Sequence, residues 1–253
     1  MWKEFFLKHH LVLVPTPIGI DLPLHAKTQE VLSGIFSTCD KNRIQILVEE
    51  AKNSRNRWVN WNFPRDWMNQ WELFNEHNQG DLKQLSNIVS NMKQGKTYFL
   101  FSDAGLPGLA DPGELLVSEC WKQGLKVTSC FFDNSSLLAL VLSGFQTSPH
   151  FHFGFLPREE NLRQVAWRQF LKGGYTSIMM ETPYRLKSFL QQWHDLVAND
   201  LSLKSVNFFL GINLNQLDEQ KWCGKFDDIW HKIPKDLKAP FIFIKSHDNS
   251  RKT

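Results

Sequence analysis

Residues 102–113, SDAGLPGLADPG, constrain the fold of this 253-residue chain more than any other stretch. The segment holds three glycines, two prolines and two aspartates. The apolar run 98–101 before it is typical of a buried strand, and residues 114–123 after it carry apolar side chains close to helical spacing. In a parallel α/β sheet, ligands bind beyond the carboxyl ends of the strands. We therefore predict a strand, a ligand-binding loop and a helix; a turn without a ligand is the alternative.

Two familiar phosphate-binding motifs are excluded. The spacing of Gly105, Gly108 and Gly113 is not G-x-G-x-x-G, so no dinucleotide pyrophosphate is indicated. Residues 95–97, GKT, resemble the end of a P-loop, but they precede their strand, and Ser90 stands where the first glycine is required. The loop is therefore expected to bind a different ligand.

Two more loops are expected near the loop 102–113. An apolar strand at residues 11–14 ends in the Pro/Gly segment 15–19. The polar residues 133–136 can cap a helix of small residues, 137–143, which Gly144 would close. The N-terminus of that helix offers free N–H groups to a polar ligand. We expect all three loops to converge on one crevice.

The remaining pattern alternates strands with helices. We expect one helix within residues 20–45, further helices over 81–94, 161–171, 186–197 and 226–233, and strands over 46–48, 125–132, 151–155, 175–181, 206–212 and 241–245. The loop-like stretch 146–150 is the expected boundary, giving an N-terminal α/β domain (1–148) and a C-terminal α/β domain (149–253). Residues 246–253 are expected to form a frayed tail.

The composition says more about where the protein is located than about the ligand it binds. The net charge of +3 says little about nucleic acid, and a hydrophobic content of 42% is ordinary for a soluble protein. No apolar run approaches the ~20 residues of a membrane span, so we expect a cytoplasmic protein. The four cysteines form no CxxC pair and are read as free thiols. His150 and His152 could chelate a metal, but no third ligand is near in sequence, and no metal site is expected.

A tryptophan-rich segment follows the strand at residues 46–48. Residues 51–65 carry four basic side chains and no acidic ones. Aromatic residues interleave with them, namely Trp58, Trp61, Phe63, Trp67 and Trp71. Such a pattern fits an RNA-facing surface, where bases stack on rings and cations neutralise phosphates. It fits a packed core or a subunit interface equally well, and the sequence leaves both readings open.

Seven segments resemble one known family. In chain order they are LVLVPTPIG, VEEAKNSRNRW, LFNEHN, SDAGLPGLADPG, NSSLLALVLSG, FGFLP and ETPYR. Their order and spacing resemble the tetrapyrrole methylase superfamily, and most of all the branch that contains the small-subunit ribosomal RNA ribose 2′-O-methyltransferases. The resemblance covers roughly residues 11–245, and the pattern SDAGxPGxxDPG is specific.

The resemblance implies a fold, a cofactor and a partner. The fold would be two α/β domains with the cofactor cleft between them, the protein a homodimer, and the cofactor S-adenosylmethionine (SAM), with S-adenosylhomocysteine as product. The positions that match the family's cofactor-binding residues are Pro17, Gly19, Asp103, Gly105, Leu106, Ser135, Ser136, Leu137, Met180, Asn213 and Pro240. The expected function is 2′-O-methylation of a ribose in ribosomal RNA, free or in the small subunit.

The acceptor side needs a base, because a ribose hydroxyl is a poor nucleophile at neutral pH. Glu49 occupies the place of the acidic residue in the family's E-D-T-R segment and is the catalytic candidate. Lys52, Arg55 and Arg185 are the candidates for binding substrate phosphates. A purely structural ion pair between Glu49 and Arg55 is the alternative.

Three departures from the family pattern bear on the substrate. Asp133 and Asn134 stand where the family usually has Gly-Pro, Asn213 replaces a small residue, and the E-D-T-R segment is not intact. Two alternatives therefore stay open. One is a tetrapyrrole or small-molecule methylase; the other is a homologue that binds SAM or RNA without transferring a methyl group.

Overall fold

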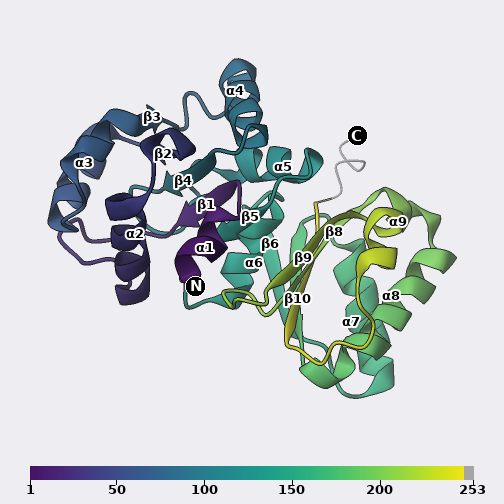
Figure 1. Cartoon of the computed structure of the whole chain (residues 1–253). Coiled ribbons are helices and arrows are strands. Elements are labelled where there is room, and N and C mark those ends of the chain that lie inside the picture. Colours follow the sequence, from purple (N-terminus) through teal and green to yellow (C-terminus); the bar gives the residue numbers. More distant parts are fainter. Residues whose placement is uncertain (248–253) are drawn as a thin grey trace. The chain divides into compact units, whose positions relative to one another are not determined.

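The computed structural model describes residues 1–247, and residues 248–253, which end the expected second domain and its tail, lie outside the described part. The chain forms two compact units, Met1–Asp133 and a second unit that begins at Asn134 (Figure 1). Each is described by itself. The boundary expected after residue 148 differs from this division, because the helix that begins at Ser135 packs with the second unit.

A parallel sheet forms the centre of the first unit. Over residues 1–133 its five strands are β1 (Leu11–Val14), β2 (Ile44–Val48), β3 (Trp71–Leu73), β4 (Thr97–Phe101) and β5 (Val127–Ser129), in the order β3-β2-β4-β1-β5. Every neighbouring pair is parallel, so the carboxyl ends of the strands share one edge. The sequence did not predict β3, because three residues around a central glutamate are too few to show alternation.

Helices and short 3-10 turns connect these strands. They are α1 (Trp2–Leu7), α2 (Ala26–Thr38), η1 (Lys41–Arg43), α3 (Ala51–Asn60), η2 (Arg65–Gln70), α4 (Leu82–Lys93) and α5 (Glu114–Lys122). In α4 the side chain of Asp81 caps the first turn by accepting from the Lys83 N–H. Its buried residues Leu85, Ile88, Val89 and Met92 recur at helical spacing and give the helix one apolar face.

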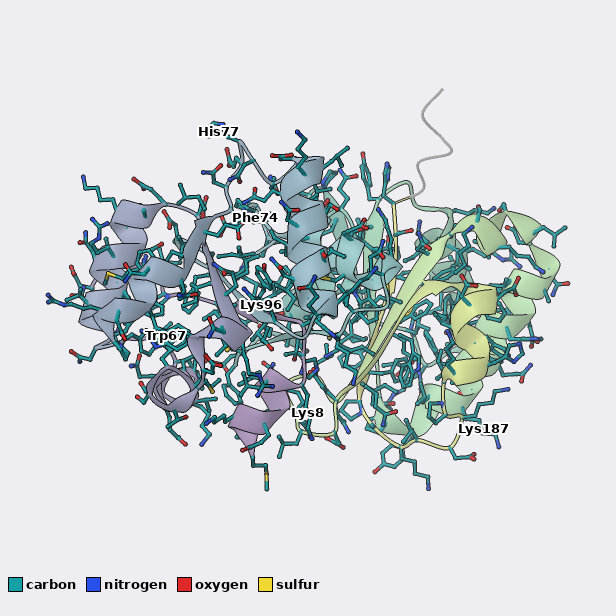
Figure 2. The ribbon with its side chains drawn as sticks, turned by 45° about the horizontal axis from the view of Figure 1, so that its top comes forward. Lys8, Trp67, Phe74, His77, Lys96 and Lys187 are labelled. Carbon is teal, nitrogen blue, oxygen red and sulfur yellow. The ribbon has the colours of Figure 1, made fainter. Side chains whose placement is uncertain are left out.

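The tryptophans of residues 58–67 belong to the core of the first unit. Trp58 and Trp67 are each 1% exposed and Trp61 is 4% exposed; Trp67 is marked in Figure 2. The indole N–H groups of these three rings donate to backbone carbonyls, at Pro64, Leu22 and Phe36. The core interpretation of these rings is therefore confirmed, and a base-stacking surface made of them is wrong. The basic side chains beside these tryptophans suggested an exposed surface. The large rings instead stabilise the unit by being buried in its core.

A mixed sheet forms the centre of the second unit. In the part described, its five strands are β6 (His150–Phe155), β7 (Thr176–Glu181), β8 (Asn207–Ile212), β9 (Gln220–Lys225) and β10 (Phe241–Lys245), in the order β6-β7-β10-β8-β9. Only β6 and β7 pair in parallel; the other neighbours are antiparallel. The sequence did not predict β9, whose residues QKWCGK lack an apolar run and are held by pairing with β8.

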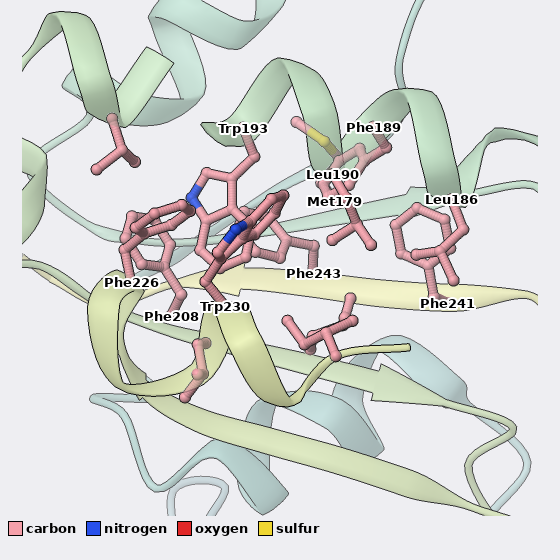
Figure 3. Packing of buried hydrophobic residues seen from close by; sticks show 14 of the residues in the cluster. Met179, Leu186, Phe189, Leu190, Trp193, Phe208, Phe226, Trp230, Phe241 and Phe243 are labelled. Atoms are coloured by element: carbon pink, nitrogen blue, oxygen red, sulfur yellow. The ribbon is translucent and has the colours of Figure 1, made fainter. Parts of the chain in front are cut away.

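The helices of the second unit cover an aromatic core. They are α6 (Ser135–Ser143), η3 (Pro183–Arg185), α7 (Glu160–Lys172), α8 (Leu186–Asn199), η4 (Leu201–Ser205), α9 (Phe226–Ile229) and η5 (Trp230–Lys232). Trp193 of α8 lies with its ring centroid 5.0 Å from that of Phe208 and 4.8 Å from that of Phe243 (Figure 3). As predicted, Asn134 caps α6 and Gly144 closes it, with φ +65°. Across residues 1–247, no helix is long and apolar enough to span a membrane.

Candidate cofactor and acceptor site

The loops after β1 and β4 are joined by backbone hydrogen bonds. The Gly105 N–H donates to the Thr16 carbonyl at 3.0 Å, and the Thr16 N–H donates to the Gly105 carbonyl at 2.8 Å. The Thr16 hydroxyl also donates to the Ser102 carbonyl at 3.1 Å. Two of the loops expected to converge therefore do so. Thr16 was not among the predicted site residues, although its position between two prolines was an available signal.

The glycines of the loop 102–113 have two different roles. Gly105 and Gly113 have φ angles of +99° and +140°, which L side chains rarely adopt. A Cβ at Gly113 would lie 3.0 Å from Leu100 Cδ2 and 3.1 Å from the Gly108 nitrogen, whereas a Cβ at Gly105 would meet nothing within 4 Å. Gly113 thus permits close packing of the loop, whereas Gly105 leaves open space where a side chain would begin.

Glu49 lies in direct contact with the loop 102–113. It follows β2, and its Oε2 accepts a hydrogen bond from the Asp103 N–H at 3.2 Å. Asn53, in the first turn of α3, donates to Asp103 Oδ2 at 2.9 Å. The parallel order places β2 beside β4, so the residues that follow both strands meet. The predicted catalytic acid and a predicted cofactor residue are therefore neighbours.

Two carboxylates at this edge, Glu49 and Asp111, have a raised pKa. Burial is the main cause of the raised pKa of Glu49; the hydrogen bond from the Asp103 N–H opposes it, and the charges of Asp103 and Glu76 add to it. Burial, followed by the charges of Glu49 and Asp103, raises the pKa of Asp111 to about 6. Asp111 was not among the predicted site residues, although it lies beside the glycines of the loop. Within residues 1–247, no group of three or more His, Cys, Asp or Glu side chains has an arrangement that would hold a metal ion.

Two carboxylate oxygens of this loop are buried without a hydrogen bond. They are Asp103 Oδ1 and Asp111 Oδ2, and no donor among the described residues reaches either. A buried acceptor without a partner costs free energy, of order 1–3 kcal/mol. Both atoms would be satisfied by a ligand that carries hydroxyl or ammonium groups.

Arg57 fixes the backbone of the loop that follows β1. It is 4% exposed, and its guanidinium donates to the Gly19 carbonyl at 3.2 Å and to the Ile18 carbonyl at 3.3 Å. The same group lies 5.9 Å from the ring centroid of Trp61. Burial lowers the pKa of Arg57. The loop bearing Pro17 and Gly19, predicted to contact the cofactor, is thus held from α3. In the sequence, Arg57 is only one of the four basic residues of the segment 51–65, and this role was not predicted.

The substrate candidates of the first unit lie on the outside of α3. Lys52 and Arg55 are both exposed. The alternative ion pair between Glu49 and Arg55 is not formed; the Glu49 carboxylate accepts from the Asp103 N–H.

A cavity of about 420 Å³ in the second unit brings together four of the predicted cofactor residues. Ser135, Met180, Asn213 and Pro240 all line it. Ser136, next to Ser135, donates from its hydroxyl to Met180 Sδ at 3.0 Å. The backbone N–H of Leu137 is taken by the Asn134 cap, so this group is not free for a ligand.

Arg185 lies on the turn that borders this cavity. Its guanidinium pairs with Glu181 Oε2 at 3.3 Å, and the Glu181 side chain is 3% exposed. Glu181, Thr182 and Pro183 line the cavity itself. Part of the guanidinium is therefore committed to fixing the turn η3. His150 and His152 have separate partners, the Thr147 carbonyl and the Ser136 hydroxyl.

Comparison with known proteins decides the family. No family model matches the chain. Ribosomal RNA small subunit methyltransferase I of Leptospira borgpetersenii is 35% identical over 184 residues, which is 72% of this chain and 71% of that protein. The protein of the same name from Thermotoga maritima is 30% identical over 221 residues, 86% of this chain and 89% of its own length. The chain belongs to the ribosomal RNA small subunit methyltransferase I family. The branch read from the motifs is thereby confirmed.

Solved structures add only weak likenesses. The methyltransferase CobJ is 13% identical over 94% of each chain, with a TM-score of 0.35. A uroporphyrin-III C-methyltransferase from Thermus thermophilus, complexed with S-adenosylhomocysteine, is 13% identical over 92% of this chain and 96% of that one, with a TM-score of 0.33. Scores of this size establish no shared fold. The family assignment rests on the sequence relatives, and the mixed α/β class follows from the strands and helices themselves.

Proposed function

We propose that this protein is a SAM-dependent methyltransferase that methylates a ribose 2′-hydroxyl of small-subunit ribosomal RNA. Membership of the family supports methyl transfer and ribosomal RNA. The observation that carries the proposal furthest is the 3.2 Å hydrogen bond from the Asp103 N–H to Glu49. It joins the candidate acceptor residue to the candidate cofactor loop.

The residues of the first unit suit such a cofactor. Bound SAM would supply a methyl group already activated by its sulfonium, so the protein has mainly to orient the acceptor and exclude water. Asp103 Oδ1 and Asp111 Oδ2 are buried acceptors that its amino and hydroxyl groups would satisfy. Gly105 leaves open space at its Cβ position in the same loop, with Leu106 next to it and Pro17 and Gly19 in the adjoining loop.

Glu49 orients the acceptor hydroxyl and accepts its proton. The raised pKa of Glu49 brings it nearer to the working pH, which makes its carboxylate a better proton acceptor than an ordinary glutamate. Lys52 and Arg55 on α3, and Arg185 on η3, contact phosphates of the substrate.

The remaining candidate cofactor positions belong to the second unit. Ser135, Met180, Asn213 and Pro240 act through the cavity they line, and Ser136 and Leu137 through the start of α6. We also propose that the protein works as a homodimer in the cytoplasm, as the family resemblance implies.

Methyl transfer from radiolabelled SAM tests the proposal. The acceptors are ribosomal RNA from cells that lack this protein, both free and assembled into small subunits. We expect label in one of the two, resistant to alkaline cleavage at the modified nucleotide, since a 2′-O-methyl group blocks that cleavage. Label in neither would refute the proposal. Calorimetry with SAM and with S-adenosylhomocysteine tests cofactor binding separately.

A further inference from the structure

A concave surface of the first unit lies on the outer side of α3. It is an open groove of about 460 Å³, whose polar walls include Arg55, Asn56, Asn60 and Arg65. Among the residues described, neither arginine forms an ion pair or a hydrogen bond, so both guanidinium groups are free to bind an anion. The one carboxylate of the groove, Asp21, accepts from the Asn60 amide at 3.4 Å. The groove therefore carries a positive excess.

Apolar side chains lie beside these cations. Ile20 and Val59 are 37% and 38% exposed and line the same groove, together with Met68. Guanidinium groups next to exposed aliphatic carbon fit a nucleotide, whose phosphate takes the cation while its base or sugar covers the apolar wall. Double-stranded RNA would offer phosphates and hydroxyls but no unstacked base. The chemistry of the groove thus favours an unpaired strand.

The groove continues from the candidate acceptor site. Lys52, Arg55, Asn56 and Val59 recur at helical spacing and share one face of α3. The helix begins two residues after Glu49, and Lys52 to Val59 spans about 10 Å at 1.5 Å per residue. A strand whose ribose lies at Glu49 can therefore follow α3 into the groove.

We propose that this groove binds an unpaired segment of the substrate RNA next to the modified nucleotide, with Arg55 and Arg65 contacting its phosphates. This inference rests on the proposed function, and it adds a strand preference and a contact, Arg65, that the catalytic site does not require. Arginine forks pair with phosphate oxygens through two parallel hydrogen bonds, and this geometry suits a fixed register along the strand.

RNA binding by the full chain tests the groove. The probes are a labelled single-stranded oligouridine of about 12 nucleotides and a duplex RNA of the same length. Binding is measured by fluorescence anisotropy between about 50 and 200 mM salt. The variant Arg55→Ala/Arg65→Ala is compared with Arg43→Ala/Lys126→Ala. The control variant removes the same charge from exposed residues that precede β2 and β5, away from the groove.

We expect the groove variant to bind the single strand about tenfold more weakly, and to lower its salt slope by about 1.4, the value for two lost phosphate contacts. The control variant should change the affinity and the salt slope by much less. With duplex RNA, the difference in affinity between the two variants should be smaller than with the single strand. Equal losses in the two variants, or equal losses for single strand and duplex, would overturn the inference. If the wild-type protein transfers no methyl group to ribosomal RNA but the groove variant still binds the single strand more weakly, the proposed function is refuted and the binding of RNA in the groove is supported.

Discussion

The Arg57 guanidinium, buried on α3, donates to the Gly19 carbonyl at 3.2 Å and so ties this helix to the loop that follows β1. Arg57→Met should loosen that loop, because two carbonyls lose a charged donor worth about 1.5–3 kcal/mol each. We expect SAM affinity, measured by calorimetry, to fall about tenfold or more. Arg43→Met, an exposed change, is the control. Arg57→Met with a lower melting temperature but unaltered SAM affinity would mean that Arg57 serves stability alone.

Glu49→Gln should separate chemistry from cofactor binding. The glutamine keeps an oxygen that can accept from the Asp103 N–H but loses the proton acceptor. We expect the methyl transfer rate to fall by about 10²–10⁴, with SAM affinity within a factor of about three. The neighbouring Glu50→Gln, an exposed residue, is the matched control. Equal rates in wild type and Glu49→Gln would remove Glu49 from the mechanism.

Asp111 should make stability depend on pH. Its pKa rises from an ordinary 3.8 to about 6 in the folded protein, so the folded state favours the protonated form. The resulting stability is present below pH 3.8 and is lost as the pH rises through about 6. Asp111→Asn should therefore melt higher than wild type at pH 8, with a difference that shrinks toward pH 4.

Asp66→Asn provides a comparison of opposite sign. The hydrogen bond from Lys41 lowers the pKa of Asp66, so its charged form favours folding. This variant should melt slightly lower than wild type at pH 8, and the difference should again shrink in acid. A pH-independent offset in Asp111→Asn would show that its charge does not act on folding.

Gly113→Ala and Gly105→Ala should differ although both positions have positive φ. Alanine at Gly113 meets Leu100 and the Gly108 nitrogen, so we expect a loss of about 1–3 kcal/mol in the free energy of unfolding. Alanine at Gly105 meets open space and should cost less stability, but it should weaken SAM binding by covering the backbone. Chemical denaturation and calorimetry measure the two effects. Equal stability losses with equal affinities would contradict these roles.

Local signals in the sequence predicted much of this structure. The Asn134 cap, the Gly144 C-cap and the strand before the loop 102–113 each depend on neighbouring residues, and each is found as expected. Four of the six positions assigned to the cofactor in the second unit line one cavity, because each lies at or next to the end of a regular element: Ser135 at the start of α6, Met180 near the end of β7, Asn213 after β8 and Pro240 before β10.

Contacts between residues far apart in the chain could not be predicted from the sequence. Strand β9 forms by pairing with β8, and no local sequence pattern predicts this pairing. The role of Arg57 depends on carbonyls 38 and 39 residues away, and in sequence it looked like any other surface arginine. Trp58 and Trp67 likewise needed the packed unit to show that they are core.

Helix α3 has a basic outer face, and its buried Arg57 donates hydrogen bonds to the loop that follows β1. This arrangement has a thermodynamic consequence. A strand of RNA that displaces or steadies the helix must alter the affinity of the protein for its methyl donor. Linkage requires the reverse effect to be equal in size, so the donor must alter RNA affinity by the same factor. The size of this coupling would be the same whichever of the two substrates binds first.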